Sequence, residues 1–450
     1  MKPIRFGEKF KQKLTSVFGP KGKHGSLKHS RPSYDTQKLT EEGNRHGIKE
    51  RRSLRSFLTM RGGRHSSGAV FEGLLNFLGA ARNYFIGINW PLLALSVLAS
   101  VYGLFMIYST HVTSLTVQIV SIVLGIIAYF LIAMFDISHL TVFWRVVMAV
   151  GVLLLLSVFV YGRSAGVNNG WLRFKIGSLD LGIQPGEVVK IFMIVTLSKR
   201  LDMIGSDITK FKGVLLATLH FAIYAAALLL SKDDGMLLAY GILFACMMFA
   251  AGVKLRYMAF GAGALVLATP LIWNYLLDYY QKMRILVVLD PTLDLEGKGY
   301  HAFISKIAIA NGGLTGMGYG KGSVTQFSNP GNLPAKHTDF IFSVICEEMG
   351  FFGAVAAVGI LIGIVVICLL VARKVRHDKF SYLVAVGVAA MIIFQTCLNV
   401  GMCMGVVPVI GLTLPFFSHG GSSILTMFVS VGFVASVGAH IRPRTLSDIY

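Results

Sequence analysis

Asp339 lies where a polar segment ends and a long apolar run begins, and it is the residue of this chain best placed to do chemistry. It follows His337 and Thr338 in the segment PAKHTDFIF. Ionisable groups beside membrane hydrocarbon are costly and are usually functional. A carboxylate at such a boundary can act as a general base on a hydroxyl group. The structural alternative is that Thr338 or Asp339 caps the helix expected to follow.

A second pair of charged residues lies early in another predicted helix. In IQPGEVVK (183–190), Pro185 suits the first helical position, and Glu187 then sits near the positive end of the helix dipole. Glu187 and Lys190 are three residues apart, so they share a helix face and can pair. At a membrane cavity the loss of one partner would leave the other charge uncompensated. The spacing fits both a structural ion pair and a direct contact with a substrate.

The preceding polar loop combines an aromatic residue with two cations. Trp171 is followed by Arg173 and Lys175 in GVNNGWLRFKIG (166–177). An indole near a membrane surface usually anchors the protein at the interface. It could also form a flat surface against which a sugar or lipid head group stacks, with the two cations facing phosphate. The short SKDDG loop (231–235) holds two acids that are expected to be turn formers.

Two other patterns are excluded as sites. The Gly-dense stretch 312–322 lacks the strand and the GxxxxGK[ST] spacing of a phosphate-binding loop. The five cysteines all lie in apolar segments, form no CxxC pair and have no histidine at ligand spacing. Disulfides and structural zinc are therefore not expected. The sequence indicates no metal site and no cofactor site.

The elements that must position these residues are predicted to be membrane-spanning helices. The chain of 450 residues is 54% hydrophobic and only 14% charged. Those values, with apolar runs of about twenty residues, are typical of a polytopic helical membrane protein rather than of two or three soluble domains. We expect an all-α fold of about ten transmembrane helices, with a large extracytoplasmic loop between helices seven and eight. The expected spans are 85–108, 115–135, 141–162, 186–201, 213–231, 235–252, 257–278, 339–372, 381–406 and 421–440.

The amino-terminal segment 1–84 is strongly basic. It holds 18 Lys and Arg residues against 6 Asp and Glu, and so carries +12 of the formal net charge of +20. A basic, Gly/Ser-rich segment with few aromatics is not expected to fold alone, and we expect a largely disordered cytoplasmic tail held against anionic lipid. Nucleic-acid binding is the weaker alternative. No short apolar core follows Met1, so we expect no signal peptide. Residues 441–450 are expected to form a second cytoplasmic tail.

Basic residues in the short loops set the expected orientation. They follow the even-numbered spans, so they all lie on the cytoplasmic side if both termini are cytoplasmic. The outer side then carries the loops 163–185, 231–234, 279–338 and 407–420. Every polar cluster described above falls on this outer side. Within the loop 279–338, the apolar pattern at 301–314 predicts a short amphipathic helix at the membrane surface.

Four polar motifs, in this order, resemble those of the SEDS family (shape, elongation, division and sporulation), which includes RodA-, FtsW- and SpoVE-like proteins. They are IQPGEVVK (183–190), LDPTLDLEGKGY (289–300), NLPAKHTDFIFSVICEEMG (332–350) and GLTLPFFSHGGSS (411–423). The resemblance covers about 85–440, a ten-helix domain, and leans towards the RodA-like members. It implies a peptidoglycan glycosyltransferase that polymerises lipid II on the outer face of the bacterial cytoplasmic membrane. A class B penicillin-binding protein, which is a transpeptidase, is the implied partner.

The resemblance also assigns roles to individual residues. The Asp of the family's HTDFIF motif is its catalytic residue and matches Asp339, and the Glu and Lys of its QPSExxK motif match Glu187 and Lys190. The family's Trp matches Trp171. Four departures on the outer side predict an altered specificity or a weakened activity. They are Gly170 for Arg, Ser231 in SKDDGM where the family has Gln-Pro-Asp-x-Gly-Thr, Ala335 for Glu, and His419 for Tyr.

The expected reaction needs one base and no metal or cofactor. Asp339 would take the proton of the GlcNAc 4-hydroxyl of one lipid II, while MurNAc C1 of another loses undecaprenyl pyrophosphate. Pyrophosphate leaves readily, so the second carboxylate of a glycosidase is not needed. A divalent cation could assist the leaving group. The residues expected to bind substrate or stabilise pyrophosphate charge are Trp171, Arg173, Lys175, Arg284, Lys336 and His337.

Two other classes of protein fit the same spans. A lipid II flippase would need the bundle and a cavity, and its transport would not depend on Asp339. A non-enzymatic scaffold would recruit or activate a class B penicillin-binding protein, so loss of the whole chain would matter while the change Asp339→Asn would not.

Overall fold

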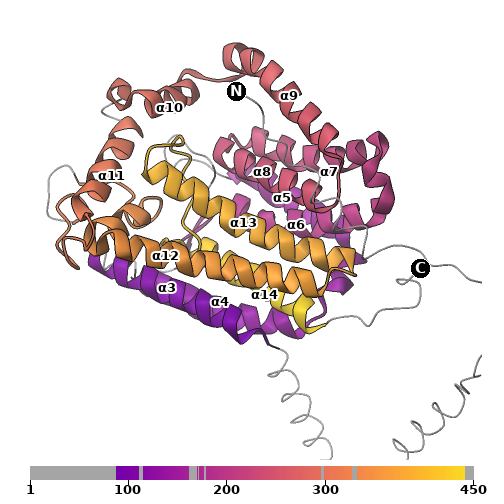
Figure 1. The fold of residues 1–450 in the computed structure, drawn as a ribbon, viewed down its shortest axis with the longest axis horizontal. Helices are drawn as coiled ribbons and strands as arrows, with labels where there is room; N and C mark the ends of the chain where they lie inside the picture. Colours follow the sequence, from indigo (N-terminus) through magenta and orange to yellow (C-terminus); the bar gives the residue numbers. More distant parts are fainter. Residues whose placement is uncertain are drawn as a thin grey trace, which may run out of the picture. The chain divides into compact units, whose positions relative to one another are not determined.

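The structure of the protein is a computed structural model, and it shows a bundle of helices (Figure 1). It describes residues 88–110, 115–161, 170, 172–176, 179–294, 298–326 and 332–440. The tails predicted at 1–84 and 441–450 lie outside the described residues, and so does Trp171.

Each of the ten predicted spans contains a helix. These helices are α3 (Trp90–Thr110), α4 (Leu115–Met134), α5 (Trp144–Tyr161), α6 (Pro185–Ile204), α7 (Phe211–Leu230), α8 (Asp234–Ala250), α9 (Leu255–Leu271), α12 (Ile341–Lys374), α13 (Lys379–Cys403) and α14 (Gly421–Ala439). Within the described part of the chain, seven helices are long and apolar enough to cross a membrane, while α5 and α8 are apolar but shorter. An all-α, multi-pass membrane protein is thereby confirmed. The count of ten crossings stays a prediction.

Helix α6 is the least apolar of these helices because it carries Glu187 and Lys190 as well as charges near its end. It packs against α5, α7, α13 and α14. Most of its side chains are buried, so its polar groups face other helices rather than lipid. Charged residues inside a membrane bundle are expected to face the interior in this way.

The bundle has a protein-facing centre and a lipid-facing rim. In the most apolar 18-residue stretches of α13 and α14, 67% and 72% of the residues are buried. In the corresponding stretch of α9 none of the residues is buried, and Figure 1 shows α9 at the edge of the bundle. A short π-helix (Ile272–Leu276) continues α9 just after Pro270. Proline lacks the amide hydrogen of a helical hydrogen bond, so Pro270 interrupts the bonding of α9 shortly before this change of winding.

The predicted outer loop 279–338 is largely helical in its first half. Helix α11 (Lys298–Gly312) matches the amphipathic helix expected at 301–314. It is preceded by α10 (Tyr279–Leu289) and a 3₁₀ turn, η5 (Pro291–Asp294), which the sequence analysis did not predict. The side chain of Gln281 explains where α10 begins, because its Oε1 accepts the Asp278 amide (2.8 Å) in the manner of a capping box.

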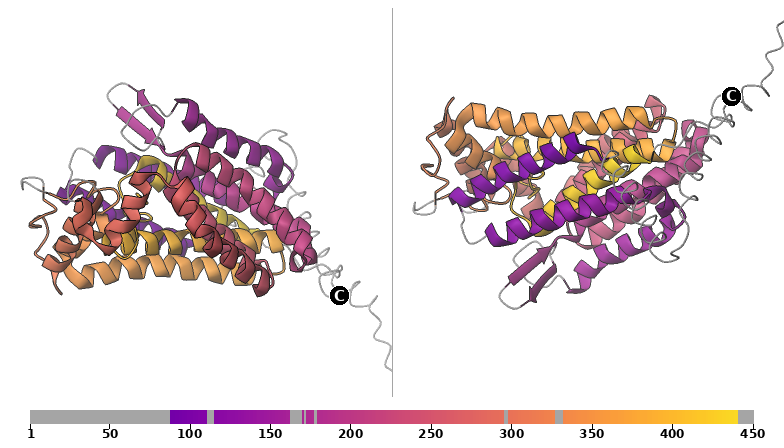
Figure 2. Two further views of the ribbon diagram at one scale, coloured as in Figure 1. Left: turned by 90° about the horizontal axis from the view of Figure 1, so that it is seen from above. Right: turned by 90° about the horizontal axis from the view of Figure 1, so that it is seen from below.

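A two-stranded hairpin is the one addition to the expected all-helical pattern among the described residues. Strands β1 (Leu172–Ile176) and β2 (Leu179–Ile183) pair antiparallel, with Leu172 opposite Ile183. Figure 2 shows the hairpin at the edge of the bundle. The alternation of apolar and charged residues in LRFKI has the period of two that is typical of a strand. Two short 3₁₀ turns, η2 (Ile137–Thr141) and η3 (Gly205–Thr209), complete the connections.

Helix α12 is broken in its third turn by Gly350, whose φ is 66° and ψ is −164°. The Gly-dense segment after α11 supplies the hydrogen bonds that this break removes. The amides of Met317 and Gly318 donate to the carbonyls of Glu347 and Glu348 (2.9 and 3.0 Å). Across the break, the amides of Phe351 and Phe352 donate to Gly313 and Leu314 (2.9 and 3.3 Å). The glycines therefore serve close backbone packing against α12.

Candidate active site

Asp339 lies in the turn that leads into α12. The amides of Thr338 and Phe340 both donate to the carbonyl of Ala335 (3.1 and 3.2 Å), and the Thr338 hydroxyl donates to the same oxygen at 3.1 Å. Phe340 is the N-cap residue of α12, so neither Thr338 nor Asp339 fills that position. The capping alternative is therefore wrong. The turn leaves Asp339 half-buried at the head of the helix.

The backbone of Asp339 is fixed by α13. Asn399 Nδ2 donates to the Asp339 carbonyl at 2.8 Å and to the Leu412 carbonyl at 2.6 Å. Gly411, just before Leu412, has a φ of +72°, and a Cβ atom placed there would lie 3.5 Å from Oδ2 of Asp339. The carboxylate therefore lies beside the glycine backbone of the segment that follows α13.

The HTD turn also meets the segment before α14. The Ser418 hydroxyl donates to the Thr338 carbonyl (2.6 Å), and the His419 amide donates to the His337 carbonyl (2.8 Å). The His337 and His419 rings pack edge to face, with centroids 5.6 Å apart. Gln118 of α4 holds this segment by donating to the Ser418 carbonyl (3.3 Å). Two motifs about eighty residues apart thus form one surface around Asp339.

Lys336 is buried beneath the same turn, with 4% of its surface exposed. Burial lowers the pKa of its ammonium group, and the nearby Glu347 and Glu348 act in the opposite direction. The structure therefore places this predicted phosphate-binding cation next to two acids of α12.

Glu347 and Glu348 are buried acids near the HTD turn that the sequence analysis did not single out. Oε1 of Glu347 accepts the amides of Ser323 and Val324 (3.0 and 3.1 Å). The carboxylate oxygens of Glu348 accept hydrogen bonds from the side chains of Ser109 and Gln326 (both 2.6 Å) and from the Gly320 amide (3.1 Å). Both side chains are 0% exposed. Two adjacent acids inside an apolar run were the available signal.

Glu187 and Lys190 form the ion pair that their spacing predicts. Lys190 Nζ lies 2.8 Å from Glu187 Oε2, and both side chains are only 2% exposed. The same nitrogen donates to Oε1 of Gln395 on α13 (2.7 Å). Burial on this scale favours the structural alternative over direct contact with a substrate in this conformation. Gln395, one turn before Asn399, connects the pair to the Asp339 region.

Asp233 is more than a turn former. Its Oδ1 accepts the Met236 amide (3.2 Å) and so caps α8, while Oδ2 accepts Gln184 Nε2 (3.2 Å). A Cβ atom at Gly170 would lie 2.9 Å from that Oδ2. Two of the four departures, at Gly170 and in the SKDDG loop, therefore adjoin in space. Asp234 accepts Gln281 Nε2 (2.6 Å) and ties α8 to α10.

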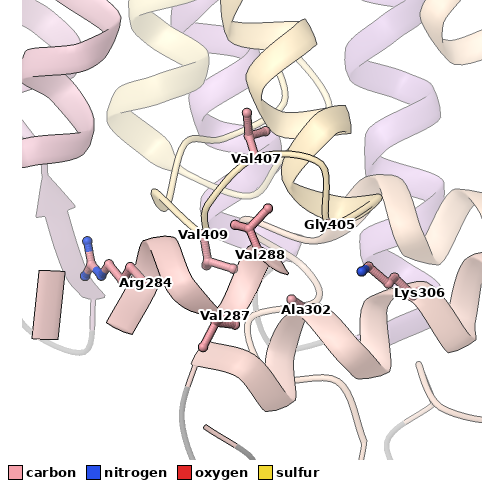
Figure 3. Close-up of a pocket in the computed structure, with 8 residues that line it drawn as sticks. All are labelled: Arg284, Val287, Val288, Ala302, Lys306, Gly405, Val407 and Val409. Carbon is pink, nitrogen blue, oxygen red and sulfur yellow. The ribbon is translucent and has the colours of Figure 1, made fainter. Parts of the chain in front are cut away.

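The remaining predicted cations lie in two places. Arg173 and Lys175 occupy β1, in register with Gly182 and Asp180 of β2. Arg284 is on α10 and lines a very small pocket, with a cavity volume of about 10 Å³, between α10, α11 and the segment after α13 (Figure 3). Lys306 of α11 lines the same pocket and was not predicted. Its ammonium nitrogen points into the pocket in Figure 3, next to Gly405.

The arrangement offers one partly exposed carboxylate beside buried, hydrogen-bonded polar groups. Such a site can remove a proton from a hydroxyl group. Among the described residues, no three His, Cys, Asp or Glu side chains form a group that could hold a metal ion.

The amino-acid sequence is similar to a family of proteins and to several named members of it. A family model described as a cell cycle protein, covering FtsW, RodA and SpoVE, matches residues 86–442. The chain is 30% identical over 379 residues to a probable peptidoglycan glycosyltransferase FtsW of Bacillus subtilis (strain 168), covering 79% of this chain and 91% of the relative. It is also 30% identical to the peptidoglycan glycosyltransferase MrdB of Escherichia coli (strain K12), over 64% of this chain and 76% of MrdB.

Solved structures agree. A chain from a peptidoglycan synthase complex, described as coordinating polymerization and crosslinking, is 30% identical and superposes with a TM-score of 0.67 over 78% of this chain and 97% of that one. The rod shape determining protein RodA of Thermus thermophilus is 26% identical, with a TM-score of 0.59 over 79% of this chain and 98% of RodA. The motif order, the fold and these matches lead to one conclusion: the chain belongs to the FtsW/RodA/SpoVE family of cell cycle proteins.

Proposed function

We propose that this protein is a peptidoglycan glycosyltransferase that polymerises lipid II, with Asp339 as the general base. The observation that carries the proposal is the setting of Asp339. Its half-buried carboxylate lies beside Gly411, and its backbone is held by Asn399 of another helix. The names of the relatives support the same activity.

The proposed reaction joins two lipid-linked sugars. Asp339 accepts the proton of the GlcNAc 4-hydroxyl of one lipid II. The oxygen of that hydroxyl forms a bond to MurNAc C1 of the other lipid II. The bond from C1 to the pyrophosphate breaks, and undecaprenyl pyrophosphate leaves with the electron pair. Arg284 and Lys306 line one pocket near the segment after α13 and are candidates for stabilising that negative charge. Arg173, Lys175, Trp171 and His337 keep the substrate-binding roles that the family motifs suggest.

The same proposal includes the surroundings of the enzyme. The protein sits in the bacterial cytoplasmic membrane with both termini in the cytoplasm, so that Asp339 faces outward. Its partner is a class B penicillin-binding protein, which the description of the matched synthase complex supports. The proposed reaction uses no metal or cofactor, and a divalent cation could assist pyrophosphate departure.

The test uses the purified full chain with labelled lipid II, alone and with a class B penicillin-binding protein added. We expect glycan strands that a muramidase digests. If neither preparation forms strands, the proposal fails.

Two outcomes would point to the other classes. Movement of labelled lipid II across liposome bilayers by both the parent and Asp339→Ala would indicate a flippase. Normal growth of cells carrying Asp339→Asn, with no growth when the whole chain is lost, would indicate a scaffold.

A further inference from the structure

Two amide side chains on α13 connect the buried ion pair to the candidate base. Gln395 and Asn399 are four residues apart, so they lie on one face of the helix. Both are buried, with 3% and 0% of their surfaces exposed. Burying an amide is costly unless its groups are hydrogen-bonded. The NH2 groups of both amides donate to groups outside α13, and within the helix Asn399 Oδ1 accepts a weak bond from Cys403 Sγ (3.9 Å).

Gln395 joins α6 to the segment after α13. Its Oε1 accepts Lys190 Nζ (2.7 Å), and its Nε2 donates to the carbonyl and the hydroxyl of Thr413 (3.1 and 3.2 Å). The Thr413 hydroxyl in turn pairs with the Ser423 hydroxyl of α14 (2.9 Å). One side chain thus ties the ion pair of α6, the segment around Thr413 and α14 together.

Asn399 joins the same segment to the candidate base. Its Nδ2 donates to two carbonyls, that of Leu412 (2.6 Å) and that of Asp339 (2.8 Å). Residues 408–414 have no regular secondary structure, yet Leu412 and Thr413 are buried. Buried backbone carbonyls need donors, and here the two amide side chains of α13 supply them.

We propose that Gln395 and Asn399 are positioning residues that set the distance between the Asp339 carboxylate and the Gly411 backbone, and that the Glu187–Lys190 pair acts on the reaction through them. The pair is too deeply buried to touch a sugar here. Lys190 instead fixes the orientation of the Gln395 amide, because Oε1 must face its ammonium group and Nε2 must then face Thr413. This inference rests on the proposed function and names how distant motif residues serve it.

The chain offers a matched control on the same helix. Thr396 is adjacent to Gln395 and is also buried, at 2% exposed, but its hydroxyl donates to the Ile392 carbonyl of its own helix (2.7 Å). Thr396→Val keeps the shape of the side chain and removes a hydrogen bond that lies entirely within α13. Gln395→Leu and Asn399→Leu remove the donors to the 412–413 carbonyls. Gln395→Glu keeps an acceptor for Lys190 but loses the donor to Thr413.

Two measurements on the purified full chain test the proposal. The first is steady-state lipid II polymerisation, normalised to folded protein. We expect kcat to fall about 100-fold in Asn399→Leu and Gln395→Leu, the cost of roughly 1 Å of misplacement, with KM changed less than threefold. Gln395→Glu should fall between these variants and the parent, and Thr396→Val should match the parent.

The second measurement does not depend on activity. Hydrogen–deuterium exchange of peptides covering 408–418 should be at least tenfold faster in Asn399→Leu than in the parent and in Thr396→Val. If the parent does not polymerise lipid II, the proposed function fails, while the exchange data still decide whether Asn399 holds the segment. Equal exchange in Asn399→Leu and Thr396→Val, or equal kcat, overturns the inference. Where a Leu variant does not fold, the Gln395→Glu comparison with Thr396→Val decides it by the same criteria.

Discussion

At Asp233, burial raises the pKa of the carboxyl group, and the nearby Glu187 and Asp234 raise it further, while bonds from Met236 and Gln184 act the other way. Among the described residues, this acid accepts hydrogen bonds from a Gln side chain and a backbone amide, both of which are neutral. Gly170, where the family resemblance led us to expect Arg, adjoins the same carboxylate, because a Cβ atom there would lie 2.9 Å from Oδ2. Burial and these neighbouring acids therefore favour the protonated form of Asp233.

The sign of this effect gives a testable pH dependence. Because the pKa of Asp233 is higher in the folded state, its contribution favours folding at low pH and is lost as pH rises above about 4, the unfolded value, through the folded value. Asp233→Asn retains a good N-cap and removes the ionisation. We expect Asp233→Asn to raise the thermal unfolding midpoint at pH 7 relative to the parent, with the difference shrinking towards pH 4. A difference that grows as pH falls would contradict the assignment.

Residue types and spacing were enough to predict the Glu187–Lys190 pair and to single out Asp339 as a candidate, because charges in an apolar sequence stand out. They were not enough for Gln395 or Asn399. Uncharged amides in an apolar helix look like ordinary polar residues, and their importance lies in the carbonyls that they reach across the fold. Those carbonyls belong to segments without regular structure, whose path a sequence pattern does not give.

Helix α12 shows how an element can be continuous in sequence and broken in structure. The apolar pattern predicted a single span at 339–372, and the structure has one helix over Ile341–Lys374 with a break at Gly350. The break was not predicted, because a glycine within an apolar run is also common in unbroken membrane helices. The hairpin at β1 and β2 was not predicted for a different reason: each strand has only five residues, and such short alternation within a polar loop is a weak signal.

The break in α12 predicts opposite effects for two glycines of one helix. At Gly350, a Cβ atom would lie 2.3 Å from the Gly316 amide nitrogen, and φ is +66°. Gly350→Ala should therefore destabilise the protein by about 3 kcal/mol or more, because the new methyl group adds both backbone strain and overpacking. At Gly359 a Cβ atom meets nothing within 4 Å. Gly359→Ala should be neutral or stabilising, by up to about 1 kcal/mol.

Thermal unfolding of both variants in the same detergent checks this pair. A loss of stability at Gly359→Ala equal to that at Gly350→Ala would show that the break is not the cause.

On the scale of the whole molecule, basic segments that are far apart in the sequence gather at one end of the bundle. Asp339 lies just before the start of α12, a helix of 34 residues, and Arg373 and Lys374 lie at its other end. Lys379 Nζ donates to the Gly205 carbonyl (3.0 Å), so the basic segments after α6 and α12 meet. This grouping is what the loop charges predicted, since cytoplasmic loops are rich in Lys and Arg.

The orientation itself can be measured by labelling single cysteines. In a background with Cys246, Cys346, Cys368, Cys397 and Cys403 replaced, Lys321→Cys and Lys210→Cys place exposed thiols at the two ends. A membrane-impermeant maleimide should label position 321 in intact spheroplasts and position 210 only after permeabilisation. The reverse pattern would place Asp339 in the cytoplasm and remove its access to an outer-leaflet substrate.

The central claim is that the carboxylate at the head of α12 performs the chemistry, and the change Asp339→Asn tests it most directly. Asn has the same shape and leaves the backbone bond from Asn399 in place, but it cannot accept a proton. In purified full-length protein with labelled lipid II, we expect the polymerisation rate to fall by at least about 100-fold with the thermal unfolding midpoint unchanged. A rate within twofold of the parent would contradict the account.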